Sequence, residues 1–522
     1  MSRRARIAIL ALPVAFLLLF FVFPFVSIVW EGLASDQTAI GRVLGEARVR
    51  DVIWFTLWQA AASTALTLAI GLPIAYALSR FAFRGRAAVE ALVVVPFVLP
   101  TVVVGMAFSG LRGSIVAILA AHVFFNIAVV VRVVGAAWAT VDPELEDAAD
   151  ELGASGLRRF TRVLLPLARP AIVTAATLVF LFTFTSFGVV LLLGGAGQTT
   201  IEVEIFRRTS QQLDLSAAAV LALIQLLFVS VLLIADAVLA SRRPVLPPPA
   251  EQGGRAPRTR GERTFGVVAV LGAIALVAVP LWRLVRRSFV GSEGATLANY
   301  LHIGEGRRGG LFEIDPGAAI WTSVRSAALA ATIALVVGGL VSIGVALGAR
   351  SRGIWAIVAI PLGVSAVTLG FGYVVAFDAD PLDLRGSTWL VPLAQALVAL
   401  PFVVRIVAPA MAAAHASLGE GAASLGASPW RALRDATLPA CAGAIRTAAV
   451  FAFVVALGEF GATAFLARAE HPTVPVAIAR LLGQPGSASI GQASALAVIL
   501  LVITAAAALT IGRGRIGSFG QS

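Results

Sequence analysis

Long apolar stretches recur along this chain, and each is about as long as a membrane-crossing helix. Short polar segments separate them. A helix needs about 20 residues to cross the hydrocarbon core of a bilayer. On that basis we expect twelve spans, at residues 7–30, 52–79, 87–109, 114–138, 170–193, 216–240, 264–287, 318–349, 353–376, 388–412, 441–466 and 490–511. The pattern therefore predicts an all-α polytopic membrane protein.

The first apolar run follows a basic N-terminus, which is also the form of a secretory signal. This run is longer than the apolar part of most signal peptides. The nearest small-residue cleavage candidate, residues 32–35, is a poor one. We expect an uncleaved first transmembrane helix, with a cleaved signal as the alternative.

Two polar segments interrupt the apolar pattern in the same way, 273 residues apart. In each, a short acidic and small-residue triplet is followed by a glycine and, 13 residues after the glycine, by a proline. The tetrapeptide LGAS at 152–155 recurs at 425–428. Residues 142–170 carry Asp147, Ala148, Ala149, Gly153 and Pro166, and residues 415–440 carry Glu420, Gly421, Ala422, Gly426 and Pro439.

The apolar runs repeat at a similar offset, so we divide the chain into two halves of six spans. The first half is 1–240 and the second is 264–522, with each polar segment between the fourth and fifth span of its half. Six is an even number, so both halves have the same orientation, as in parallel repeats related by an axis along the membrane normal. Residues 241–263 are rich in proline, glycine and arginine, which predicts a flexible cytoplasmic linker. A basic patch on the lipid surface is the alternative.

Composition agrees with a membrane protein: the chain is 59% hydrophobic and 13% charged, with a mean hydropathy of +0.93. The formal charge of +12 comes from arginines that punctuate the apolar runs, which disfavours a nucleic-acid-binding stripe. With the N-terminus inside, more arginines fall in the cytoplasmic segments than in the outer ones. That orientation puts both termini and both polar segments in the cytoplasm.

The spacing of the two polar segments resembles the EAA loop of ABC importer permeases, which follows the pattern E-A-A, three residues, G, nine residues, I-x-L-P. In that family the loop forms a short coupling helix that docks into a groove on the ATPase subunit. Asp147 stands for the family's glutamate, Gly421 for an alanine, and Val163 and Ala436 for the isoleucine. The alternative is that each segment is an ordinary polar loop between spans.

The resemblance implies a fused permease with two six-helix repeats of the type I importer kind, in a bacterial cytoplasmic membrane. Its expected partners are a cytoplasmic ABC ATPase dimer, an extracytoplasmic solute-binding protein and a small solute. Residues 184–225 look more like a thiamine permease than a ferric iron permease of the same group. Thiamine is therefore the expected solute and ferric iron the next. The alternative is that this segment is scaffold common to several substrates.

A translocation pathway is expected where the halves align at Ser186, Phe187, Glu459 and Phe460. An ionisable group at membrane depth is a functional candidate by default, so Glu459 is expected to face the pathway. A structural pairing of Glu459 with an arginine such as Arg325 is the alternative. The two phenylalanines could equally be packing residues.

No catalytic residue, metal site or cofactor is expected in this chain. It has no lysine, so it cannot build a lysine-containing phosphate-binding loop, and a separate ATPase must hydrolyse the ATP. Its four histidines are scattered and Cys441 is its one cysteine. The rival function is an ion-coupled secondary transporter of a small solute. That class would more often bury acids in several spans, whereas here they are few, chiefly Asp236 and Glu459.

Overall fold

A computed structural model describes residues 3–35, 38–154, 156–240, 254–291, 294–303, 315–348, 364–378, 382–468, 470–484 and 486–512. Helices dominate this part of the chain, and a short antiparallel hairpin pairs Val290 with Ala295. The all-α prediction is confirmed.

Up to the linker, several spans are assembled from more than one helical segment. The elements are α1 (Arg3–Leu17), η1 (Leu18–Val22), α2 (Phe23–Trp30), η2 (Glu31–Ser35), α3 (Ala39–Gly45), α4 (Ala47–Arg80), α5 (Arg86–Val98), α6 (Thr101–Phe108), η3 (Ser109–Leu111), α7 (Ile115–Ala139), α8 (Pro143–Glu151), α9 (Gly156–Arg159), η4 (Phe160–Leu164), α10 (Leu165–Phe184), α11 (Gly188–Leu193), α12 (Ile201–Arg207), η5 (Arg208–Gln212) and α13 (Leu215–Ala240).

After the linker the same style of construction continues. The elements are α14 (Arg260–Ser288), β1 (Val290–Gly291), β2 (Gly294–Ala295), α15 (Ala298–Leu301), α16 (Pro316–Ala346), α18 (Ala366–Ala376), α19 (Leu390–Ala414), η7 (His415–Gly419), α20 (Glu420–Ser424), α21 (Pro429–Arg431), η8 (Ala432–Thr437), α22 (Leu438–Ala440), α23 (Ala442–Gly458), α24 (Thr463–Leu466), α25 (Val474–Gly483) and α26 (Ser487–Gly512).

Within the described residues, nine helices are long and apolar enough to cross a membrane, and two further candidates are bent pairs. The pair at 86–111 bends by 101° and the pair at 429–458 by 66°. The first bend lies at Leu99, which is extended because the residue before a proline disfavours helical geometry. Of the predicted span 353–376, residues 353–363 lie outside the described part of the chain.

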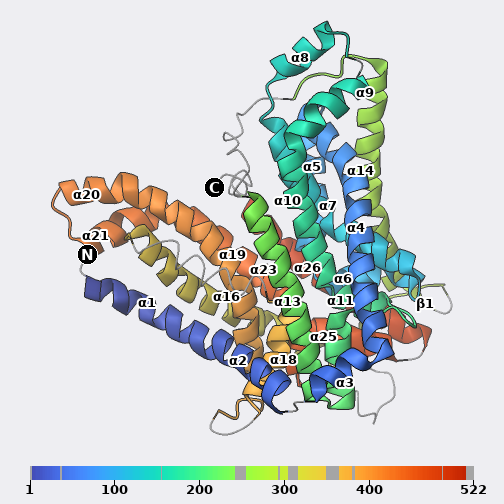
Figure 1. Ribbon diagram of the computed structural model, residues 1–522, viewed down its shortest axis with the longest axis vertical. Helices are drawn as coiled ribbons and strands as arrows, with labels where there is room; N and C mark the ends of the chain where they lie inside the picture. Colours follow the sequence, from blue (N-terminus) through green and yellow to red (C-terminus); the bar gives the residue numbers. More distant parts are fainter. Residues whose placement is uncertain are drawn as a thin grey trace.

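The first helix of each predicted half packs against the other half. Helices α1 and α2 contact α16 and α18, whereas α14 contacts α4, α5 and α6. Figure 1 shows α1 running beside α16, and α14 running beside α4. The two halves are therefore interleaved, and the linker leads directly into a helix that lies on the first half.

Two arms diverge from a shared base in Figure 1. The first arm contains α4, α7, α10 and α14 and carries α8 and α9 at its tip; the second contains α1, α16 and α19 and carries α20 and α21. Helices α2, α18 and α25 lie at the base. The two polar segments of the sequence thus occupy the ends of separate arms.

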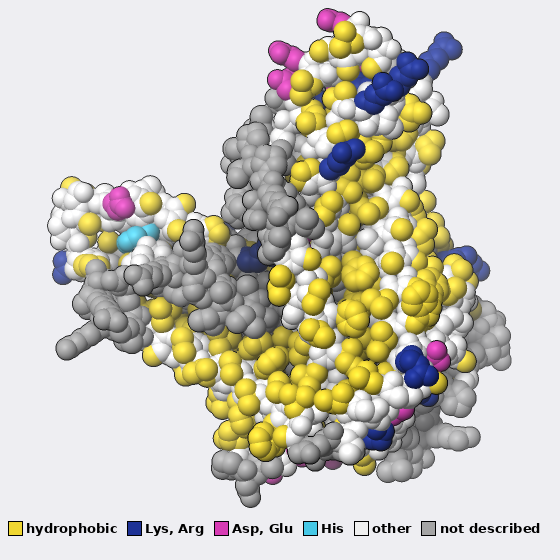
Figure 2. Space-filling view, in the orientation of Figure 1, with side chains coloured by type: hydrophobic (Ala, Val, Ile, Leu, Met, Phe, Trp, Pro, Cys, Tyr) yellow, Lys and Arg dark blue, Asp and Glu magenta, His cyan; other side chains and the backbone are white. Residues whose placement is uncertain are grey.

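Hydrophobic side chains cover the middle of the visible face, and charged side chains gather at the tips and the base (Figure 2). On α13 and α14 the exposed apolar residues include Leu227, Ile234, Val268 and Leu271. This distribution is that of a surface in contact with lipid, and the protein is a multi-pass membrane protein.

Candidate functional site

The first polar segment forms a short helix with a defined start and stop. Asp142 accepts a hydrogen bond from the Glu144 amide (3.0 Å), and Pro143 is the first residue of α8. At its other end Gly153 has a φ of +75°, and the Ala154 amide donates to the Ala149 carbonyl (3.0 Å). This is a Schellman cap, which a glycine in left-handed geometry allows.

The second polar segment ends its helix in the same way. Gly426 has a φ of +86°, and the Ala427 amide donates to the Ala422 carbonyl (3.0 Å). Gly421 lies on α20, and no atom lies within 4 Å of the position that a Cβ would take. Gly153 and Gly426 therefore end their helices with the same geometry. Gly421, which takes the place of the family's alanine, lies where an alanine side chain would also fit.

The prolines lie inside continuous helical runs. Pro166 is near the start of α10, but residues 156–164 before it are already helical, with a π-helical turn at η4. Pro439 lies in α22, directly after the π-helical turn η8, and the chain then bends at Cys441. Each proline thus marks where the polar segment enters the next membrane helix.

Large apolar side chains project from both segments at matched positions. Leu152 and Leu425 are 89% and 91% exposed, Leu157 and Trp430 are 74% and 61%, and Leu145 and Leu418 are both 49%. Every pair is 273 residues apart. We call these sets the first apolar triad (Leu145, Leu152, Leu157) and the second apolar triad (Leu418, Leu425, Trp430). Exposed large apolar side chains at the end of a helical arm make each tip a candidate interaction surface.

The charges of the two segments differ. The exposed Asp147 accepts a hydrogen bond from Arg258 (2.5 Å), which holds the pKa of this carboxyl below its usual value. Glu420, which takes the place of Asp147 in the second segment, is exposed. The apolar triads are thus repeated between the segments more closely than the charges are.

Two of the predicted pathway residues meet where the halves join. The rings of Phe187 and Phe460 stack with centroids 5.3 Å apart, and both side chains are buried. Phe206 lies against Phe187 (5.4 Å) and against Phe465 (5.2 Å). We call Phe187, Phe206, Phe460 and Phe465 the aromatic seal, because two rings come from each half and every ring packs against another.

The other two predicted pathway residues are bonded within their own halves. Ser186 pairs with His122 Nε2 (2.8 Å), whose Nδ1 pairs with Ser63 (2.9 Å). Glu459 accepts from the amides of Ala462 (2.7 Å) and Thr463 (3.1 Å). Both side chains are buried directly beside a residue of the aromatic seal, and the structure does not bring them to each other. Glu459 holds the turn that follows Phe460.

Residues 68–243 match the family model described as the binding-protein-dependent transport system inner membrane component. This part of the chain is therefore similar to the membrane component of such transporters. It is also similar to thiamine transport system permease proteins: 28% identical to that of Salmonella typhimurium over 87% of both chains, and 26% to that of Escherichia coli over 91% of both. The Brucella abortus protein is 28% identical over 86% of this chain and 84% of its own. The resemblance drawn from the sequence is confirmed.

Two buried carboxylates on α12 escaped the sequence prediction, Glu202 and Glu204. Glu202 on α12 accepts from Gln225 (2.5 Å) and is hydrogen-bonded to Ser365 at the start of α18. It is one helical turn before Phe206 of the aromatic seal. These acids lie between the predicted spans 170–193 and 216–240, so hydropathy does not place them at membrane depth.

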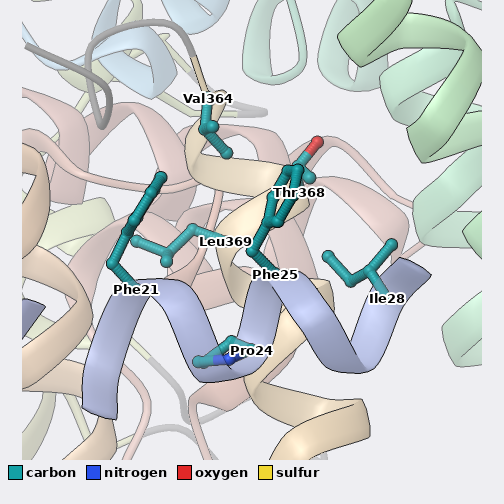
Figure 3. A pocket seen from close by; sticks show the side chains of 7 residues that line it. All are labelled: Phe21, Pro24, Phe25, Ile28, Val364, Thr368 and Leu369. Atoms are coloured by element: carbon teal, nitrogen blue, oxygen red, sulfur yellow. The ribbon is translucent and has the colours of Figure 1, made fainter. Parts of the chain in front are cut away.

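A small cavity lies near the start of α18, close to the Ser365 that is hydrogen-bonded to Glu202. Its volume is about 10 Å³, and it lies between α2 and α18, lined by Phe21, Pro24, Phe25, Ile28, Val364, Thr368 and Leu369 (Figure 3). That volume is about the minimum for one water molecule. In the described residues, the aromatic seal fills the place where Phe187 and Phe460 meet.

Proposed function

We propose that this permease is the transmembrane subunit of a binding-protein-dependent ABC importer and that it brings thiamine into the cytoplasm. The observation that carries the proposal is the matched pair of coupling segments, each with a glycine-capped helix and an exposed apolar triad at the tip of its own arm. Similarity to thiamine permeases along most of the chain supports the choice of solute.

Each apolar triad docks into a groove of one subunit of a cytoplasmic ATPase dimer. When the dimer closes on ATP, the two tips are pulled together and the arms follow as rigid levers. The arginine distribution supports a bacterial cytoplasmic membrane orientation with both termini and both coupling segments inside. A solute-binding protein docks at the opposite end, near the base of the arms.

The pathway runs between the halves and is closed at the aromatic seal in the present conformation. With the seal closed at the base and the arms apart at the tips, the permease faces inward. Separation of Phe187 from Phe460 opens the outer side when the arms close. Ser186 and Glu459 belong to this pathway segment, because each fixes the backbone beside one of the two stacked rings.

The chemistry of the seal suits an organic cation. Aromatic faces attract a positive charge, and the carboxylate of Glu202 is one helical turn from Phe206. Thiamine carries a positive charge on a flat ring, so it can slide between phenylalanine faces toward that carboxylate. The permease makes no covalent change to its solute.

Uptake into vesicles tests the proposal against ion-coupled transport. The permease, its ATPase and its binding protein are reconstituted, and radiolabelled thiamine uptake is measured with ATP, with an ion gradient, and with an ATPase variant that cannot hydrolyse ATP. Thiamine uptake that requires ATP hydrolysis supports the proposal. Repeating the assay with ferric iron in place of thiamine tests which solute is transported. Uptake driven by a proton or sodium gradient with the inactive ATPase would establish the secondary-transport alternative instead.

A further inference from the structure

The first coupling segment is fastened by a cluster of charges that begins at a buried carboxylate. Glu146 on α8 is buried and bonded to Arg80 at the end of α4. Arg159 on α9, also buried, lies 3.5 Å from Glu146 and donates to Asp150 at 2.6 Å. The helix that carries the first apolar triad is thus tied to α4 and α9 of its own half.

The described end of the linker adds a second set of ties. Arg255 pairs with the chain at the end of α4: its amide donates to the Arg80 carbonyl (2.9 Å), and its carbonyl accepts from the Ala82 amide (3.0 Å). Its guanidinium lies 5.6 Å from the centre of the Phe81 ring. A Cβ on Gly254 would come within 2.8 Å of the Phe81 backbone, so the linker backbone is in close contact with the first half. Residues 241–253 of the predicted linker lie outside the described part of the chain.

Glu262 closes the cluster from the end of the predicted linker, where α14 begins. This residue is in the first turn of α14, and it accepts from Arg159 (2.6 Å) and from Arg255 (2.6 Å and 2.8 Å). Arg258, four residues earlier, donates to Asp147 of the coupling segment (2.5 Å). We call Arg80, Glu146, Arg159, Arg255, Arg258 and Glu262 the brace. Through it, the first coupling segment is joined to a helix that belongs to the other half of the sequence.

The second coupling segment has uncharged residues at three positions that carry charge in the first. At the 273-residue offset, Gly419 replaces Glu146, Ala423 replaces Asp150, and Ala432 replaces Arg159. In the described part of that segment, Arg434 forms an ion pair with Asp435, and both side chains are exposed. Exposed pairs of this kind contribute little to stability.

From this difference we infer that the two coupling segments are mechanically unequal: the brace locks the first one to α4 and α14 of its arm, whereas the second has no charged residues at the matched positions to lock it in this way. The stroke of one ATPase subunit is then transmitted through a more rigid connection than the stroke of the other. The brace residues are positioning residues, since they act through the helix that bears the first apolar triad.

Hydrogen exchange of the permease in lipid nanodiscs, without ATPase or solute, tests this inference. Amides of residues 144–152 are expected to exchange at least roughly tenfold more slowly than those of 420–425, because local opening of α8 must break buried ion pairs. Glu262→Gln should raise exchange in 144–152 roughly tenfold and leave 420–425 unchanged. Glu90→Gln is the matched control, since it removes an acid from another pair of the first half, with Arg86 at 2.7 Å.

Swapping the charges of Asp147 and Arg258 gives a second test, with the same hydrogen-exchange measurement. Arg258→Asp alone should speed amide exchange in residues 144–152, because the new aspartate would lie beside the acids of α8. Adding Asp147→Arg should restore slow exchange. Both side chains are about half exposed, so these variants can fold even if Glu262→Gln does not. The inference is overturned if the two segments exchange at the same rate in the unaltered permease, or if neither set of changes affects 144–152. The inference rests on the coupling role proposed above. The exchange rates are measured without solute or ATPase, so a failed uptake experiment would not change them.

Discussion

The apolar triads make a quantitative prediction about ATPase affinity. Leu152 and Leu425 are each about nine-tenths exposed in the free permease, so docking can remove nearly the whole side chain from water. Leu152→Ala and Leu425→Ala shorten these side chains without changing charge. Both lie just before the capping glycines, where alanine fits the backbone as well as leucine does.

The expected loss follows from the buried area. Truncation of leucine to alanine removes three carbons, at about 0.8 kcal/mol for each carbon group that docking buries. Full burial therefore gives up to about 2.4 kcal/mol per position, and half burial gives about 1.2 kcal/mol. At about 1.4 kcal/mol per factor of ten, each variant should weaken ATPase binding by roughly 5- to 50-fold. If the two segments dock on separate subunits, the two losses should add in the double variant.

The assay is a titration of fluorescent ATPase against the permease in nanodiscs. Leu301→Ala is the control, because Leu301 is 73% exposed on α15 beside the β1–β2 hairpin and away from both tips. The reasoning is refuted if both coupling variants bind ATPase with unchanged affinity while remaining folded and inserted. Equal weakening by the control would show instead that the assay reports general surface hydrophobicity.

Three further predictions concern single sites. Gly153→Ala forces a left-handed residue and should lower thermal stability by about 1 kcal/mol, whereas Gly421→Ala, with open space around it, should be neutral or stabilising; equal melting shifts would contradict this. Phe460→Ala should let thiamine leak through reconstituted vesicles without ATP, and an ATP-dependent rate with no leak would count against the seal. Arg208 lowers the pKa of Glu46 by hydrogen bonding, so this pair stabilises the fold above the unfolded carboxyl's pKa of 4.5, and the contribution is lost as pH falls through the lower folded value. Melting between pH 3 and 7 should show that loss, and Glu46→Gln should remove it.

The membrane class and the ends of the two short polar helices have local causes, so the sequence reveals them. Span length and hydropathy reveal a membrane helix, and a glycine after a short polar helix predicts a left-handed cap, as found at Gly153 and Gly426. The apolar triads were also within reach of the sequence. Leu152 and Leu425 are part of the repeated LGAS motif, but a leucine in a polar loop is conspicuous only when its exposure is known.

The remaining features depend on tertiary contacts. Hydropathy does not show which helices are neighbours, so the packing of α14 on the first half could not be foreseen. The linker was predicted to be flexible from its composition, yet Arg255 and Arg258 within it reach the acids of α8. The carboxylate of Glu202 was missed because a short polar helix between spans resembles an outer loop in sequence.

Crosslinking to the ATPase tests the central claim most directly. Cys441 is buried and is the one cysteine of the chain, so Cys441→Ala gives a background for Leu152→Cys, Leu425→Cys and the control Leu301→Cys. With short bifunctional reagents and a cysteine in the groove of each ATPase subunit, we predict crosslinks from both coupling positions and none from the control. Thiamine uptake that continues while neither coupling position can be crosslinked would contradict the account.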